Sequence, residues 1–349
     1  METYSAKIFD LSSENSKKDI EKAGQIIKNG GLVVFPTETV YGLGGNATDA
    51  FAAQKIYAAK GRPSDNPLII HVSEPRDAEL YTYTNDLYYK LAKAFMPGPI
   101  TVILKAKDVV PRTVTAGLDT VAVRCPSHPV AREFIRVAGV AIAAPSANLS
   151  GSPSPTCYRY VAEDMTGRVD MIIDGGDCEI GLESTIVKIE DDSSLTLLRP
   201  GAITVEDLSQ VCEKVNVADA VLASLKEGEV ALSPGMKYRH YAPKSQFCLL
   251  DGDLTLRRAY VLENKERAAI LCYEEEIDTF SDFLPKERIF NMGKKEDKLS
   301  HAHKLFTLLR DADTENTDVI YAPLPTLDGI GMALYNRMIR AAAHKIIKL

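Results

Sequence analysis

Apolar residues recur at helical spacing in several stretches of the chain, separated by short apolar runs bounded by glycine or proline. Ile20, Ala23 and Ile27 follow the period of a helix, which predicts a helix over 15–29 that ends at Gly30. The same spacing predicts helices over 49–60, 130–137, 158–165 and 204–215. Short apolar runs predict strands over 32–35, 68–72, 100–104, 121–124, 140–143, 170–173, 183–189 and 195–198. Isolated strands, consecutive strands and helices occur together, so we expect an α/β fold with a twisted mixed sheet flanked by helices.

The pattern changes near Asn216. The stretch to Gly228 is weakly helical, and the proline-bounded segment 233–244 cannot be a helix interior. Beyond it, strands are predicted over 247–250, 269–272 and 319–321, with helices over 256–264, 298–311 and 330–343. This alternation indicates a smaller βαβ domain with a parallel sheet, without the glycine fingerprint of a dinucleotide site. We therefore expect a catalytic domain over 1–215, an interdomain linker over 216–245 and a C-terminal domain over 246–349.

Composition narrows the class of protein. The 349 residues are 45% hydrophobic, and no apolar run approaches the ~20 residues of a membrane span. The first residues lack the basic and apolar regions of a secretory signal, and the six cysteines contain no Cys-x-x-Cys pair. A cytoplasmic protein with reduced thiols and without a metal site is expected. His301 and His303 are interpreted as surface residues, and the net charge of -7 argues against a general nucleic-acid-binding surface.

Two polar loops follow the first predicted strands. Thr37-Glu38-Thr39 comes directly after a buried strand, where ligand sites of α/β proteins tend to lie. Lys60 and Arg62 lie in a loop before Pro63 and suit an anionic ligand. The glycines after Thr39 would permit close approach of the backbone to that ligand. The alternative is that the threonines close a turn and the cations are solvated.

Other polar segments are individually weaker signals. Ser146 and Asn148 follow a strand of small residues, and Arg124 ends an alternating strand. Glu183-Ser184-Thr185 and Arg199-Pro200-Gly201 add hydroxyl and cationic groups. No nucleophile–base arrangement and no P-loop motif is present, so the site would act by orienting anionic substrates.

Together these motifs resemble the threonylcarbamoyl-AMP synthase family in its two-domain form. The resemblance covers essentially the whole chain and is carried by the segment 35–43, by Lys60 and Arg62, by Ser146 and Asn148, and by the segment 233–243. It implies a YrdC-like N-terminal domain and a smaller C-terminal Rossmann-like domain. It also implies a nucleotidyltransferase that converts L-threonine, bicarbonate and ATP into L-threonylcarbamoyladenylate and diphosphate. The product would serve N6-threonylcarbamoylation of adenosine 37 in tRNAs that read ANN codons.

The resemblance also assigns site residues. L-threonine would be held by Thr39, His71, Arg124 and Ser184, with Arg124 on the carboxylate. ATP would be held by Arg62, Asn66, Thr120, Ser146, Ser154, Arg199 and Tyr241. The catalytic group would be Lys60, Arg62, Ser146 and Asn148. Mg²⁺ is expected with ATP. The expected partners are the downstream tRNA threonylcarbamoyl transferase machinery and tRNA itself, which would be contacted weakly. No association with a membrane is expected.

Two questions about mechanism stay open at this point. Glu38 and His71 are the available general bases, and neither is compelling. The segment from Tyr238 to Tyr241 is predicted to fold over the nucleotide as a lid, with an ordered interdomain strap as the alternative. A noncatalytic RNA-binding module and a carbamoyltransferase-like relative are the rival functions. The acidic charge opposes the first, and the missing acylphosphatase-type and zinc-finger segments oppose the second.

Overall fold

The computed structural model describes residues 2–222 and 240–349. The described residues form two compact units. The N-terminal unit contains residues 2–150, 154–179 and 183–222, and the C-terminal unit contains 151–153, 180–182 and 240–349. The predicted boundaries 1–215, 216–245 and 246–349 place the linker partly outside the described residues and stay a prediction.

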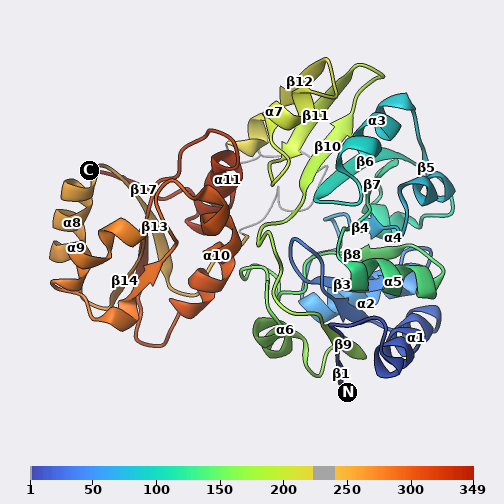
Figure 1. Cartoon of the computed structure of the whole chain (residues 1–349), viewed down its shortest axis with the longest axis horizontal. Coiled ribbons are helices and arrows are strands. Elements are labelled where there is room, and N and C mark those ends of the chain that lie inside the picture. Colours follow the sequence, from blue (N-terminus) through green and yellow to red (C-terminus); the bar gives the residue numbers. More distant parts are fainter. Residues whose placement is uncertain (1, 223–239) are drawn as a thin grey trace. The chain divides into compact units, whose positions relative to one another are not determined.

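The N-terminal unit is built on a mixed sheet, as predicted. Within the described residues its order is β1-β9-β2-β3-β8-β4-β7-β6-β10-β11-β12, with β5 paired to β6 (Figure 1). Both parallel pairs, such as β4 with β7, and antiparallel pairs, such as β4 with β8, occur. The strands are β1 (Tyr4–Lys7), β2 (Val33–Phe35), β3 (Gly42–Asn46), β4 (Ile69–His71), β5 (Thr82–Tyr83), β6 (Ile100–Ala106), β7 (Thr120–Arg124), β8 (Ile142–Ala144), β9 (Met171–Asp174), β10 (Thr185–Ile189), β11 (Ser194–Arg199) and β12 (Lys214–Val217).

Local sequence explains the helices of this unit. The Asp49 side chain caps the first turn of one helix, and Gly61 ends that helix in the left-handed conformation with φ 63°. The α-helices are α1 (Glu14–Lys28), α2 (Ala50–Lys60), α3 (Asp86–Phe95), α4 (Arg112–Thr115), α5 (Pro129–Ala138), α6 (Tyr158–Met165) and α7 (Val205–Ser209), and 3₁₀ turns cover η1 (Pro75–Leu80) and η2 (Asp219–Val221).

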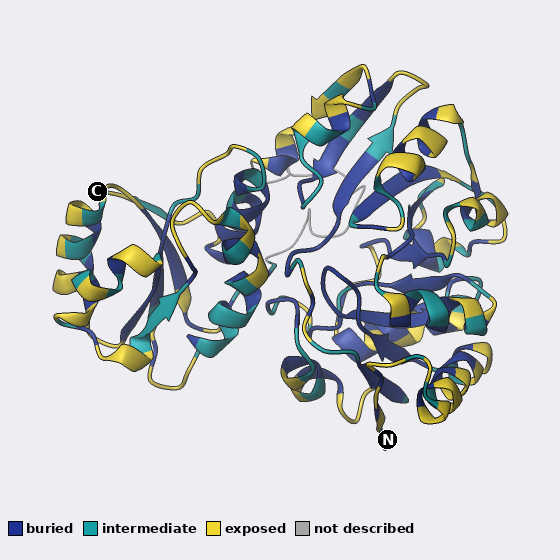
Figure 2. Ribbon diagram, viewed as in Figure 1, coloured by how far each residue is buried: buried dark blue, intermediate teal, exposed yellow. Residues whose placement is uncertain are grey.

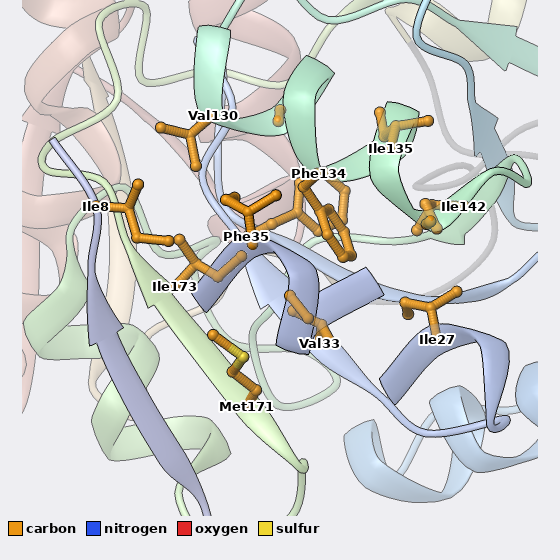
Figure 3. Close-up of a cluster of buried hydrophobic side chains, with 14 of the residues drawn as sticks. Ile8, Ile27, Val33, Phe35, Val130, Phe134, Ile135, Ile142, Met171 and Ile173 are labelled. Atoms are coloured by element: carbon orange, nitrogen blue, oxygen red, sulfur yellow. The ribbon is translucent and has the colours of Figure 1, made fainter. Parts of the chain in front are cut away.

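The core of the N-terminal unit lies between one face of the sheet and helices α1 and α5. Phe35 and Phe134 meet with ring centroids 5.3 Å apart (Figure 3). Val33, Ile142 and Met171 lie in the same cluster, and all five side chains are fully buried. The central strands of the sheet are buried, whereas the outward faces of the helices and most of the edge strands β1 and β12 are exposed (Figure 2). The burial of these apolar side chains stabilises the sheet and so holds in place the strand ends that carry the polar loops.

The C-terminal unit is a parallel five-stranded sheet of order β15-β14-β16-β13-β17 within its described residues. Helices α8 and α9 lie on one side of the sheet, and α10 and α11 lie on the other (Figure 1). This confirms the predicted parallel βαβ domain. Its elements are β13 (Gln246–Asp251), α8 (Leu254–Glu263), β14 (Ala268–Cys272), η3 (Glu274–Glu276), α9 (Ile277–Ser281), η4 (Lys286–Arg288), β15 (Ile289–Asn291), α10 (Lys298–Asp311), β16 (Val319–Pro323), α11 (Gly331–Ala341) and β17 (Ile346–Lys348).

Three predictions about local structure are wrong. The helix that begins after Thr204 ends at Ser209, not at Val215, because residues 214–217 pair in parallel with β11 as strand β12. The weakly helical stretch that follows is strand β12 and the 3₁₀ turn η2 up to residue 221, and its remainder lies outside the described residues. His301 is 5% exposed rather than a surface residue, whereas His303 is exposed as predicted.

Candidate functional site

The first polar loop leaves the end of β2 as a tight hydroxyl-closed turn. The Thr37 hydroxyl donates to the Val40 carbonyl at 2.6 Å and accepts from the Thr39 amide at 3.2 Å. It also lies 2.9 Å from the Thr39 hydroxyl, and both side chains are buried. Thr37 therefore closes the turn, as the alternative interpretation held, and this turn sets the positions of Glu38 and Thr39.

A buried ion pair links this loop to the end of β7. Arg124 Nη2 donates to Glu38 Oε1 at 2.7 Å, and the two side chains are 5% and 4% exposed. The other carboxylate oxygen of Glu38 accepts from the Ser127 amide at 3.2 Å. Nε of Arg124 is buried and has no hydrogen-bond partner within the described residues. The pair thus orients the guanidinium and leaves one buried donor open, which is the arrangement that a ligand carboxylate requires.

His71 is brought beside Arg124 by the register of the sheet. The two residues are partners in the parallel pairing of β4 and β7. His71 Nδ1 lies 3.2 Å from the Ile69 carbonyl and 3.3 Å from the Ile142 carbonyl, so Nδ1 carries the proton and Nε2 is an acceptor. Burial and the charge of Arg124 lower the pKa of His71 to about 3. A neutral imidazole with so low a pKa is a poor general base near pH 7.

Ser184 continues the same group of polar side chains across the next strands. Thr101 is the register partner of Arg124 in the pairing of β6 and β7, and its hydroxyl lies 2.7 Å from the Ser184 hydroxyl. Arg199 donates to the Ser184 hydroxyl at 3.1 Å and to its carbonyl at 3.0 Å. The predicted threonine ligands Thr39, His71, Arg124 and Ser184 are therefore linked by register and by hydrogen bonds. Arg199, predicted on the nucleotide, joins this group.

A second polar group gathers around Lys60 at the end of α2. Its ammonium donates to the Ser146 carbonyl at 2.5 Å, to the Asn148 carbonyl at 2.7 Å and to Asn148 Oδ1 at 3.2 Å. The Ser146 hydroxyl also donates to Asn148 Oδ1, at 2.5 Å. Three of the four predicted catalytic residues are thus brought together. Because an ammonium has three N–H donors, Lys60 here holds the loop and contributes its charge without an open donor.

Arg62 and Asn66 form the neighbouring part of this region. Arg62 Nη2 donates to the carbonyls of Asn66 and Pro67 at 3.1 and 3.2 Å, which closes the loop between α2 and β4. Asn66 is 1% exposed, and neither its amide nitrogen nor its amide oxygen has a hydrogen-bond partner in the described part of the chain. An unsatisfied buried amide is costly, so this position is suited to a ligand that provides both a donor and an acceptor.

The two polar groups are adjacent because their loops pair. Gly42 forms an isolated antiparallel bridge with Ser146, and the Ala147 amide donates to the Tyr41 carbonyl at 2.8 Å. The loop that carries Thr37–Thr39 therefore runs beside the loop that carries Ser146 and Asn148. One polar region results, with the open Arg124 donor and the open Asn66 amide in its two groups.

The remaining predicted residues have mixed placements. Thr120 begins β7, at the opposite end of that strand from Arg124. The Ser154 hydroxyl donates to the buried Glu183 carboxylate at 2.6 Å. Tyr241 belongs to the C-terminal unit, where its ring stacks on Phe306 with centroids 5.2 Å apart. None of these placements tests the predicted roles.

Parts of the lid prediction lie outside the described residues. Tyr238 and Arg239 are among them. His240 and Tyr241 are described and lie in the C-terminal unit, with Tyr241 in the left-handed conformation at φ 63°. The lid over the nucleotide stays a prediction.

The glycines after the first loop lie against core side chains. Residues 42–46 form strand β3, and a Cβ on Gly44 would lie 2.6 Å from Ile142 Cγ2 and 3.0 Å from the Phe35 ring. A Cβ on Gly42 would lie 3.0 Å from the same ring. These glycines make room for core side chains, because a larger residue would displace the ring.

Sequence reasoning missed Thr101, which is the register partner of Arg124 and whose hydroxyl lies 2.7 Å from the Ser184 hydroxyl. It named Glu183 and Glu38 in polar segments, but it did not anticipate that Glu183 accepts from Ser154 or that Glu38 forms an ion pair with Arg124. Nothing in the residue types distinguishes these contacts, because each depends on which strands become neighbours.

No group of three or more His, Cys, Asp or Glu side chains that could hold a metal occurs within residues 2–222 and 240–349. Over the same ranges, none of the helices has the length and hydropathy needed to cross a bilayer. The six cysteines, all described, are free thiols.

Comparison with known proteins covers both units. Residues 25–201 match the family model Sua5_yciO_yrdC, described as "Telomere recombination". Residues 203–343 match "Threonylcarbamoyl-AMP synthase, C-terminal domain". The threonylcarbamoyl-AMP synthases of Pyrococcus abyssi and Bacillus subtilis are each 41% identical, over 98% and 97% of this chain and 99% and 98% of their own lengths. The crystal structure of P. abyssi Sua5 complexed with L-threonine matches with a TM-score of 0.88 at 37% identity, covering all of both chains.

Proposed function

Because this chain belongs to the threonylcarbamoyl-AMP synthase family, we propose that its polar region makes L-threonylcarbamoyladenylate and diphosphate from L-threonine, bicarbonate and ATP. The chain is an enzyme of the nucleotidyltransferase type. The observation that carries the proposal is the pair of open buried hydrogen-bonding groups, Arg124 Nε and the Asn66 amide, in one polar region. The Arg124 Nε–H suits a carboxylate, and the Asn66 amide suits a nucleotide.

The threonine end of the region is the group around Arg124. Its guanidinium pairs with the substrate carboxylate through the open Nε–H, while Glu38 fixes its orientation. His71 Nε2 accepts a hydrogen bond from the ammonium or hydroxyl of threonine. The hydroxyls of Thr39 and Ser184 complete the contacts. Arg124 and Glu38 therefore act by holding the substrate in a fixed geometry. Catalysis by positioning of the substrates requires such fixed contacts.

The phosphate end is the group around Lys60 and Arg62. Arg62, Ser146 and Asn66 contact the nucleotide, and Lys60 holds the 146–148 loop in place while its positive charge favours the leaving diphosphate. Thr120, Ser154, Arg199 and Tyr241 stay as proposed nucleotide contacts. Lys60 is therefore a positioning residue, and it does not itself donate a hydrogen bond to the phosphates.

The reaction needs no protein nucleophile. The neutral threonine amine attacks the carbon of bicarbonate, which loses water, or of CO₂, with release of a proton to solvent, and in both cases a carbamate forms. A carbamate oxygen then attacks the α-phosphate of ATP, and the bond to diphosphate breaks. Mg²⁺ is proposed to arrive with ATP and to be held by phosphates and water, since no three-residue ligand group exists among the described residues. The low pKa of His71 and the ion pair of Glu38 make both poor bases. The amine therefore loses its proton to solvent.

The biological context is proposed from the same family. The adenylate would be passed to a tRNA threonylcarbamoyl transferase that modifies adenosine 37. Direct tRNA contact and a cytoplasmic location are part of this proposal. The mixed anhydride hydrolyses readily, so transfer close to its site of formation is favoured.

Diphosphate release tests the proposal directly. The full chain is incubated with Mg-ATP, ¹³C-bicarbonate and each of the twenty amino acids, and diphosphate and product mass are measured. We expect release that depends on L-threonine and bicarbonate, with one ¹³C atom per product. Arg124→Lys removes the planar fork and should raise the KM for threonine more than that for ATP. Release that does not depend on the amino acid would refute the proposal.

A further inference from the structure

The C-terminal unit contains a cavity of about 230 Å³ that the proposed reaction does not use. It lies at the carboxyl ends of the parallel strands. Three of its lining residues show this: Tyr273 directly follows β14, Lys295 lies in the loop after β15, and Thr326 lies in the loop after β16. Each of three adjacent strands therefore contributes a loop to the cavity.

The topology explains why a cavity forms there. Strand β14 lies between β15 and β16 and leads into α9 on one side of the sheet. Its two neighbours lead into α10 and α11 on the other side (Figure 1). Loops that leave adjacent strands toward opposite sides open a crevice, and this is where open parallel sheets bind ligands.

The charges around the cavity are balanced. Its charged lining residues are two lysines and two carboxylates: Lys295, Lys298, Glu296 and Asp328. Lys298 and Asp328 form an ion pair with each other. The side chains of Lys295 and Glu296 have no ion pair within the described chain and are exposed at the rim. A ligand with one charge can pair with only one of these two side chains, whereas a zwitterion offers an opposite charge to each of them.

The wall of the cavity is aromatic and has an open acceptor. The rings of Tyr273 and His301 lie 5.0 Å apart at 34°. His301 Nε2 lies 2.8 Å from the Lys294 carbonyl, so Nε2 carries the proton and Nδ1 is an acceptor. Burial lowers the pKa of His301, which keeps the ring neutral and preserves the charge balance. The volume is below the ~300–1,000 Å³ of pockets for drug-sized ligands, so the ligand is small.

We propose that this cavity is a second ligand site that binds a free α-amino acid. The ligand carboxylate pairs with Lys295, its ammonium pairs with Glu296, and its side chain lies against the Tyr273–His301 wall. This binding does not depend on ATP or on the proposed reaction.

The test is amino-acid binding to the full chain without ATP, measured by saturation-transfer NMR and isothermal titration calorimetry with the twenty L-amino acids. We compare the wild type with the double variant Lys295→Ala/Glu296→Ala. The matched control is Lys286→Ala/Glu287→Ala, which removes the same two charges from an exposed turn of the same unit. Arg124→Lys separates this site from the threonine site of the N-terminal unit.

At least one amino acid is expected to bind the wild type, the control and Arg124→Lys equally, and the rim double variant at least about tenfold more weakly. Binding that Arg124→Lys weakens and the rim variant leaves unchanged belongs to the catalytic site and contradicts the proposal. Binding of acetate or methylamine as tight as that of the amino acid, or no binding sensitive to the rim variant, also overturns it. Circular dichroism shows whether the variants are folded.

Discussion

A fall in pH should destabilise the threonine end of the site, because it would force a proton onto His71, which is buried beside the positive charge of Arg124. Its imidazole has a pKa lowered from 6.5 to about 3 by burial first and by the Arg124 charge second. That difference corresponds to roughly 5 kcal/mol against protonation in the folded state. At pH 5 only about 1% of folded molecules would carry His71 as imidazolium, whereas most unfolded molecules would.

The consequence for stability has a defined sign. A lowered folded-state pKa means that the unfolded chain binds the proton more tightly. The contribution of His71 to stability is therefore complete above about pH 6.5 and is lost as the pH falls toward 3. At pH 5 this loss is about 2 kcal/mol relative to pH 8.

Imidazole NMR on ¹³C-histidine-labelled protein measures the effect. The variant His71→Asn assigns the resonance and keeps a donor near the Ile69 carbonyl, and His303→Asn is the exposed control. The His71 signal should not titrate above pH 4. Urea unfolding at pH 8 and pH 5 should show that the variant loses about 2 kcal/mol less than the wild type. A His71 pKa above about 5, or equal losses in both proteins, would refute the reasoning.

Three further predictions concern fixed geometry. Glu38→Gln should raise the KM for L-threonine on the order of tenfold to a hundredfold, with a smaller effect on kcat, because Arg124 loses its orienting partner; an unchanged KM in steady-state diphosphate release would show that Arg124 needs no partner. Lys60→Arg should be as inactive as Lys60→Ala, since a planar fork cannot make three converging bonds to the 146–148 loop; substantial activity of the arginine variant would instead make Lys60 a simple phosphate cation. Gly201→Ala should destabilise the N-terminal unit by about 1–3 kcal/mol in urea unfolding, because its Cβ would lie 2.5 Å from the Thr185 amide nitrogen, and a neutral result would mean that the 199–201 turn shifts freely.

The local pattern of apolar and polar residues predicted many helices and strands correctly, because such elements depend mainly on residues that are close in the sequence. Helices α6 and α10 occur over the predicted residues, 158–165 and 298–311, since helical periodicity is a local signal. Strand β3 escaped prediction because its Gly-Leu-Gly-Gly run lacks the side chains that usually mark strands. Its glycines are explained by the core side chains that pack against them, among them the ring of Phe35 from β2 and Ile142 from β8. Strand β12 was likewise assigned to a helix because its pairing with β11 is not visible locally.

The class of the fold, the places of the polar loops along the chain and the resemblance to the family can be read from the residues alone, because motifs such as Thr37-Glu38-Thr39 and Lys60-x-Arg62 are recognised without knowing their neighbours in space. Which of these groups come into contact, and in which protonation state, depends on the folded chain. The register of β4, β7 and β6 places His71, Arg124 and Thr101 side by side, and the same burial makes His71 neutral and pairs Arg124 with Glu38. Such contacts join residues up to 86 positions apart. They follow from strand order and the exclusion of water, which no local stretch of sequence contains.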